Sequence, residues 1–211
     1  LVEARKTWRP FFAAANPLVK RTLGKLLDHK TGKRMAQSAP RLASHPRKRA
    51  QAQRARGSRA MTPEAANAAG VTPAGTGIDG IVWNVLGQAY VPLQVSDASF
   101  AWHATFPSET FVPPHIHDTQ DEFIRVLDGT LDLVLDGQQM TAGTGDLVRM
   151  PRGLAHGLFN TSGETLTALF WATPTGHLFD LFKAIHNVAD PREVVRISAE
   201  HEVRFMKPVK A

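Results

Sequence analysis

Short β-type segments alternate with tight turn signals between Gly80 and Ala172, and this alternation constrains the fold more than any other feature of the chain. Asp128-Gly129 and Asp136-Gly137 each predict a hairpin turn, because Asp-Gly accepts the left-handed backbone that such turns need. About eight short strands in this spacing favour an all-β, double-sheet jelly roll. The expected strands cover or include Ile81–Leu86, Tyr90–Val95, Ser99–Phe106, His115–His117, Phe123–Leu127, Leu131–Leu135, Leu147–Met150, His156 and Thr165–Ala172.

Three histidines and one glutamate occur at the ends of these segments. His115 and His117 are two residues apart, so on an extended strand both side chains leave the same face and can grip one ion. Glu122 follows after the polar turn 118–121, and a hairpin there would bring its carboxylate back over the histidines. The bend Pro151-Arg-Gly153 then delivers His156 as the fourth candidate ligand.

The chemistry of this group predicts a metal site. Three imidazoles and one carboxylate suit Fe, Mn, Ni, Cu or Zn, and such a set leaves coordination positions open for substrate or oxygen. A lone His-x-His pair is often structural, a lone Glu122 reads as a solvated turn acid, and a lone His156 as a hydrogen-bonded histidine. Because all four residues occur together, the sequence favours one divalent transition metal held by His115, His117, Glu122 and His156.

With these residues in place, the chain resembles the cupin superfamily. The first cupin motif is matched by His115, His117, Glu122 and Gly129, with Glu109 where the motif begins with glycine. The second motif is matched in full, by the residues Gly145, Pro151, Gly153, His156 and Asn160. Pro113-Pro114 before the histidine pair and 172–176 after the last strand are similar to small single-domain cupins of the quercetin 2,3-dioxygenase-like group.

The resemblance implies a double-stranded β-helix, the cupin jelly-roll barrel, followed by C-terminal helices. It also implies that the four ligands hold the metal, that Glu122 is a ligand, a catalytic general base or both, and that the protein forms a homodimer. Two functions stay open: a dioxygenase of a small enolic, phenolic or flavonol-like substrate, and a non-catalytic module that binds a small molecule.

Strand alternation predicts which side chains surround the ligands. Residues that share the parity of Glu122 and His156 should face the same interior, and large aromatic residues nearby are candidates to contact a substrate, although each is more typical of a barrel core. The predicted pocket comprises Trp102, Phe106, Ile124, Val126, Leu158, Asn160 and Trp171.

Charge divides the chain near residue 60. Residues 1–60 hold 16 Lys and Arg but only two acidic residues, whereas 61–211 hold 9 basic and 17 acidic residues. We expect 1–60 to be a basic, disordered tail or an over-extended gene start, because Met61 stands where the composition changes. The amphipathic basic segment at 16–27 alternatively suits a membrane surface, a targeting sequence or a nucleic acid; for the barrel itself we expect no nucleic-acid partner.

The rest of the chain divides into a linker at 61–79, the barrel at 80–176 and a helical tail at 177–211. Leu178, Leu181, Phe182 and Ile185 form an apolar helical stripe, and Asp190-Pro191 begins a second helix running to about Glu200. There is no cysteine, so any metal must be held by His and carboxylate. No apolar run is long enough to span a bilayer, and we expect a cytoplasmic protein with a small-molecule substrate.

Overall fold

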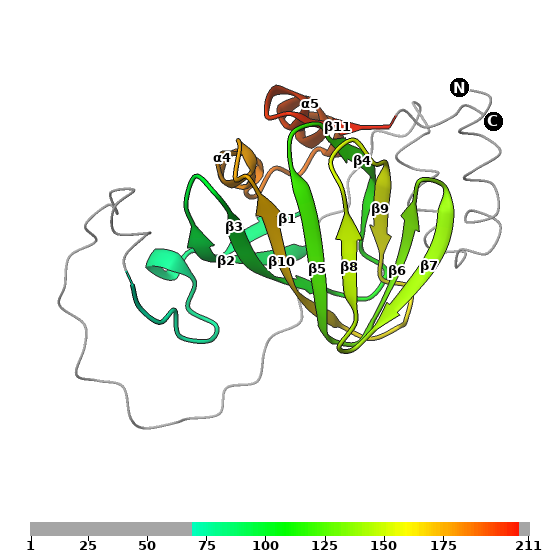
Figure 1. Cartoon of the computed structure of the whole chain (residues 1–211), viewed down its shortest axis with the longest axis horizontal. Helices are drawn as coiled ribbons and strands as arrows, with labels where there is room; N and C mark the ends of the chain where they lie inside the picture. Colours follow the sequence, from blue (N-terminus) through cyan, green and yellow to red (C-terminus); the bar gives the residue numbers. More distant parts are fainter. Residues whose placement is uncertain (1–68, 207–211) are drawn as a thin grey trace.

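Two antiparallel β-sheets face each other in the computed structural model, which describes residues 69–206 (Figure 1). The six-stranded sheet has the order β1 (Trp83–Val85), β2 (Gln88–Val95), β3 (Phe100–Phe106), β10 (Leu166–Thr173), β5 (Asp121–Asp128) and β8 (Leu147–Met150). The five-stranded sheet has the order β11 (Val203–Phe205), β4 (Phe111–His117), β9 (His156–Phe159), β6 (Thr130–Leu135) and β7 (Gln138–Gly143). The all-β jelly roll predicted from the sequence is confirmed.

Alternating side chains fill the space between the sheets. β3 and β10 bury every second residue, and the inward aromatic rings stack across neighbouring strands, as between Trp102 and Phe170 at 5.3 Å. This period of two is what an extended strand with one buried face requires. The core therefore lies between the two sheets, with a dense aromatic part on the six-stranded sheet.

The two Asp-Gly turns differ in what they connect. Asp136-Gly137 joins β6 to β7 as a hairpin within one sheet, as predicted, with φ of 45° and 81°. Asp128-Gly129 does not form a hairpin, because β5 and β6 belong to different sheets. The hairpin expected around residues 118–121 is wrong for the same reason: β4 and β5 lie in opposite sheets.

Two helices follow the barrel and lie together at one end of it (Figure 1). Helix α4 (Leu178–Ile185) buries the predicted stripe, and α5 (Pro191–Glu200) begins at Asp190, whose carboxylate accepts a hydrogen bond from the Arg192 N–H at 3.0 Å. The tail is not purely helical, since β11 returns to pair with β4.

The expectations for residues 1–60 and for the basic segment at 16–27 lie outside the described residues, as does the first part of the linker, residues 61–68. The short 3-10 turn η1 (Ile78–Gly80) precedes the first strand. Within residues 69–206, no helix combines the length and the apolar character needed to cross a membrane.

Candidate metal centre

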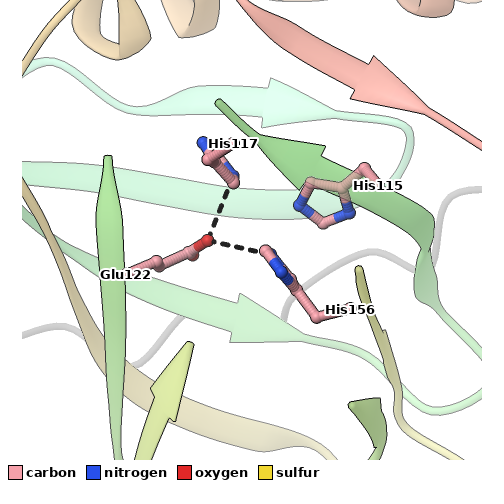
Figure 2. A group of neighbouring side chains, drawn as sticks. All are labelled: His115, His117, Glu122 and His156. Carbon is pink, nitrogen blue, oxygen red and sulfur yellow. Dashed lines mark ion pairs between the residues drawn. The ribbon is translucent and has the colours of Figure 1, made fainter. Parts of the chain in front are cut away.

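Four buried side chains converge between the sheets, and they are the four that the sequence singled out. His115 and His117 come from β4 and His156 from β9 of the five-stranded sheet, while Glu122 faces them from β5 of the six-stranded sheet. Each is at most 5% exposed, and their four ligand atoms all lie within 4.8 Å of one another. Figure 2 shows the three imidazole rings arranged around the carboxylate.

Each imidazole is oriented by a carbonyl oxygen near its Nδ1 atom. For His115 the acceptor is the Pro113 carbonyl at 2.8 Å, for His156 it is the Leu154 carbonyl at 3.0 Å, and for His117 it is Gln120 Oε1 at 3.2 Å. A carbonyl oxygen can only accept, so each Nδ1 must carry the proton and donate it. In the neutral ring this leaves the Nε2 lone pair free to bind a cation.

The Nε2 atoms meet a carboxylate rather than a donor. Glu122 Oε2 lies 3.1 Å from His117 Nε2 and 3.3 Å from His156 Nε2. Among the described residues, neither Glu122 Oε2 nor His156 Nε2 has a partner in hydrogen-bonding geometry. Lone pairs that face one another in a buried space repel unless a cation lies between them, so this donor set fits a transition metal.

The pKa values of the cluster reflect its burial and the short distances between its members. Burial alone would raise the pKa of Glu122, but contacts with His117 and His156 hold it below its usual range. Burial and the neighbouring imidazoles lower the pKa of His115. Burial also opposes the charged form of His117, yet Glu122 raises its pKa overall. The carboxylate is therefore ionised and His115 neutral at pH 7, the forms that a metal ligand needs.

Gln120 supports this centre and was missed by the sequence analysis. It is 1% exposed, and besides accepting from His117 it donates through Nε2 to the carbonyls of Pro174, at 3.2 Å, and Thr175. The sequence offered only a polar residue in a turn. Its role depends on the segment after β10, which folding brings against the β4–β5 turn.

A cavity of about 80 Å³ is lined by three of the four candidate ligands, His115, His117 and Glu122. Its walls come from both sheets and from α4, α5 and β11, and its lining side chains are mainly apolar. Leu178, Leu181, Phe182 and Ile185 contribute from α4, and Phe205 contributes from β11. The C-terminal segment therefore completes the cavity as well as packing on the barrel.

The structure sorts five of the seven predicted pocket residues into two groups. Trp102 and Leu158 line the cavity together with His115, His117 and Glu122. Phe106, Ile124 and Val126 are fully buried but do not line it, since they lie further along their strands in the barrel core. The inward parity predicted for these three residues holds, while their proximity to the cavity does not.

Asn160 and Trp171 do not lie where the sequence analysis placed them. Asn160 is buried and donates from Nδ2 to the carbonyls of Phe106 and Glu164, both at 2.8 Å, so it holds the end of β9 in place. Trp171 lies on the outer face of β10, where it stacks on Phe123 at 5.2 Å. The parity of β10 turns Phe170 inward instead, and Phe170 lines the cavity.

The one departure from the first motif has a visible backbone consequence. Glu109 occupies the position where the motif has glycine, and its φ is 65°, in the left-handed region that glycine adopts without strain. The Glu109 N–H donates to the Asn160 carbonyl at 2.8 Å, so the turn entering β4 keeps its shape with glutamate. The ligands on β4 are consequently unaffected.

Comparison with known proteins agrees with this architecture. Residues 102–172 match the family model described as "Cupin domain". The chain is also similar to the quercetin 2,3-dioxygenase of Bacillus subtilis (strain 168), with 35% identity over 81 residues. That alignment covers 38% of this chain and 23% of the dioxygenase, so the match spans under a quarter of the relative's length.

Solved structures with a similar arrangement include KdgF from Halomonas sp., at 19% identity and a TM-score of 0.40, covering 44% of this chain and 84% of that one. An RmlC-like cupin from Shewanella frigidimarina has 17% identity and a TM-score of 0.44, covering 47% and 87% respectively.

Proposed function

The chain contains a cupin domain, and from this premise we propose that it is a metal-dependent enzyme, a dioxygenase of a small enolic or phenolic compound. The observation that carries the proposal is the convergence of three Nε2 atoms and one carboxylate in a buried space beside a cavity. The similarity to a quercetin dioxygenase over 81 residues supports the reaction type.

His115, His117, His156 and Glu122 would hold the metal. A divalent transition metal bound there would supply Lewis acidity toward a hydroxyl group and a route for electrons between substrate and O₂. Both oxygen atoms of O₂ enter the substrate in a dioxygenase reaction, so the substrate provides the electrons and no external reductant is required. Fe, Mn, Ni, Cu and Zn all suit this donor set.

Glu122 is also placed to move a proton. It is the only carboxylate among the residues that line the cavity in the described part of the chain, and it is ionised because its pKa is held low by His117 and His156. A carboxylate next to a substrate hydroxyl can accept its proton as general base. The apolar wall opposite excludes water, which strengthens the interaction of the resulting oxyanion with nearby positive charge.

The size of the cavity favours a compact substrate. Its volume of about 80 Å³ is below the roughly 300–1,000 Å³ of pockets for drug-sized ligands. A single-ring phenol or a short enol suits this space. A three-ring flavonol requires the lining helices α4 and α5 to move, so we place single-ring compounds ahead of flavonols.

Oxygen uptake by metal-loaded protein tests the proposal. The full chain is loaded in turn with Fe(II), Mn(II), Ni(II), Cu(II) and Zn(II), its metal content is measured, and O₂ consumption is followed with catechol, 4-methylcatechol and quercetin. We expect near-stoichiometric metal and uptake with a single-ring compound for at least one redox-active metal. Uptake with quercetin alone would contradict the substrate class.

A pair of histidine variants provides the control. His115→Ala removes a ligand and should abolish uptake. His103→Ala removes a half-buried histidine from β3 that does not line the cavity, so it should retain metal and uptake. If no metal supports uptake although the small molecules bind, the function is that of a binding module. We also propose a homodimer, which light scattering on the purified protein tests.

A further inference from the structure

The cavity wall formed by β2 and β3 carries polar atoms that the proposed chemistry does not use. Gln88, Tyr90 and Trp102 line the cavity and are at most 6% exposed. Their surroundings are otherwise aromatic and aliphatic, since Trp102 lies between the rings of Phe100 and Phe170. Buried polar side chains are rarely placed in such a wall without a partner.

The hydrogen bond between Tyr90 and Gln88 leaves two donors of this wall unused. The Tyr90 hydroxyl donates to Gln88 Oε1 at 2.5 Å, which fixes the amide with its nitrogen turned away from Tyr90. Within residues 69–206, the buried Trp102 Nε1 has no hydrogen-bond partner, and Tyr90 bonds the oxygen of the Gln88 amide and not its Nε2. Buried indole and amide N–H groups are normally paired, so a ligand oxygen is the partner that fits both.

The position of these donors separates them from the metal centre. Trp102 is on β3, and Glu122 is on β5 with β10 between them. Neighbouring strands lie about 4.8 Å apart, so the two are on the order of 10 Å apart along the sheet. Gln88 is on β2, the strand beyond β3, so it is one strand further from Glu122 than Trp102 is.

The charges around the cavity define the kind of oxygen that this wall accepts. No lysine or arginine is among the described residues that line it, and Glu122 contributes a negative charge. Burial and the Glu122 carboxylate raise the pKa of Tyr90, so its hydroxyl stays protonated and donates to Gln88 Oε1. A ligand carboxylate would meet repulsion without a counter-charge, whereas a carbonyl or ether oxygen meets only neutral donors.

We propose that Gln88 Nε2 and Trp102 Nε1 form a specificity subsite for an uncharged oxygen acceptor, a carbonyl or ether group on the side of the ligand opposite its metal-binding oxygens. Tyr90 positions the Gln88 amide. The proposal rests on the proposed function for the placement of the other end of the ligand at the histidines. The subsite would favour single-ring compounds that carry a carbonyl or ether oxygen on the side of the ring opposite the metal-binding oxygens.

Binding to zinc-loaded full chain tests the subsite without turnover, because Zn²⁺ has no redox chemistry. Isothermal titration under nitrogen gives the affinity for 3,4-dihydroxybenzaldehyde, which has a carbonyl opposite its hydroxyls, and for 4-methylcatechol, which lacks it. The ratio of the two affinities should fall about fivefold to tenfold in Gln88→Leu and in Trp102→Phe, the effect of one hydrogen bond. The affinity for 4-methylcatechol should change less than about twofold.

Gln94→Leu is the matched control, since Gln94 is also on β2 but does not line the cavity, and its ratio should equal that of the wild type. Thermal unfolding and zinc content of each variant establish that the fold and the metal site are retained. A ratio unchanged in both variants, equal loss of affinity for both compounds, or no binding by the wild type would overturn the subsite. If iron-loaded protein shows no oxygen uptake while the ratio falls as expected, the dioxygenase proposal fails and the subsite stands.

Discussion

The two ends of the cavity are built from similar strands but held together by different interactions. At the histidine end, His115, His117, Glu122 and His156 face one another, and hydrogen bonds at Nδ1 fix the three histidine rings. At the aromatic end, Phe100, Trp102 and Phe170 stack at ring distances of 4.8 and 5.3 Å. The first end is a set of polar groups without an internal charge balance, and the second is an extension of the core.

This difference explains what each end requires. Buried polar groups destabilise a fold unless they are paired, so the histidine end fits a bound cation. Buried aromatic rings stabilise a fold by themselves, at about 25 cal/mol for each Å² of apolar surface removed from water. Substitutions at the histidine end should therefore act on metal binding, and substitutions at the aromatic end on the free energy of unfolding.

The largest effect is expected from removing half of the donor set in the double variant His117→Ala, Glu122→Ala. A site with four protein ligands can bind zinc with roughly 10–16 kcal/mol, so losing two ligands should cost on the order of 5 kcal/mol of metal-binding free energy. Elemental analysis of the purified variant should find no stoichiometric transition metal. His103→Ala should retain the metal; equal metal content in the double variant would remove the basis of the catalytic proposal.

The next largest effect is expected from Phe106→Ala, which should lower the free energy of unfolding without changing metal binding. Phe106 is fully buried and stacks on Phe170 at 5.9 Å, but it does not line the cavity. Removing a buried phenyl ring costs about 3–5 kcal/mol of unfolding free energy. Urea denaturation of the metal-free protein measures this loss, while metal stoichiometry of the folded variant should be unchanged. Loss of metal without loss of stability would contradict this assignment and show that Phe106 supports the histidine end.

The clustering of these four residues was predictable from the sequence because each occurs at a strand end with a fixed spacing to the next turn. His115 and His117 needed only the alternation of a strand, and Glu122 and His156 needed the turns before them. Gln120 was not predictable, because its partners Pro174 and Thr175 are more than 50 residues away. Trp102 and Trp171 are the same residue type within predicted strands. Which of them faces the interior depends on the alternation of side chains along β3 and β10.

The fold shows the same limit of local sequence. Asp128-Gly129 and Asp136-Gly137 are the same dipeptide, yet the first crosses between sheets and the second closes a hairpin. Local backbone preference determines that the chain turns, while packing between sheets determines where the next strand pairs. Likewise, Val203–Phe205 joins the sheet as β11 because β4 presents a free edge to it.

Gln120→Met should have an intermediate effect confined to the histidine end. Methionine has a similar length but no strong acceptor for the His117 Nδ1 proton, so the ring loses its fixed orientation. Loss of such an outer partner typically weakens metal affinity by about 10–100-fold. Competition with a chelating zinc indicator measures the change, and Gln139→Met on the exposed strand β7 is the control. Unchanged affinity would show that His117 does not depend on Gln120.

The smallest effect should come from the ion pair beside the histidine end, between Asp121 and Arg152. The Arg152 side chain and backbone N–H donate to the Asp121 carboxylate and lower its pKa to about 2. The ordinary pKa of Asp is near 3.9, so the folded state favours the ionised carboxylate; the stabilisation is present above pH 4 and is lost as the pH falls through 2.

The difference in melting temperature between wild type and Asp121→Asn should thus be a few degrees at most at pH 6, because the pair is solvent-exposed, and should shrink toward pH 2. Thermal unfolding of both metal-free proteins across this range measures it, and the histidines, common to both, cancel in the difference. Arg152 belongs to the bend that precedes His156, and the neighbouring Gly153 N–H donates to the His117 carbonyl at 2.8 Å. A difference that stays constant with pH would mean that this bend is held at the histidine end by its backbone contacts and not by the ion pair.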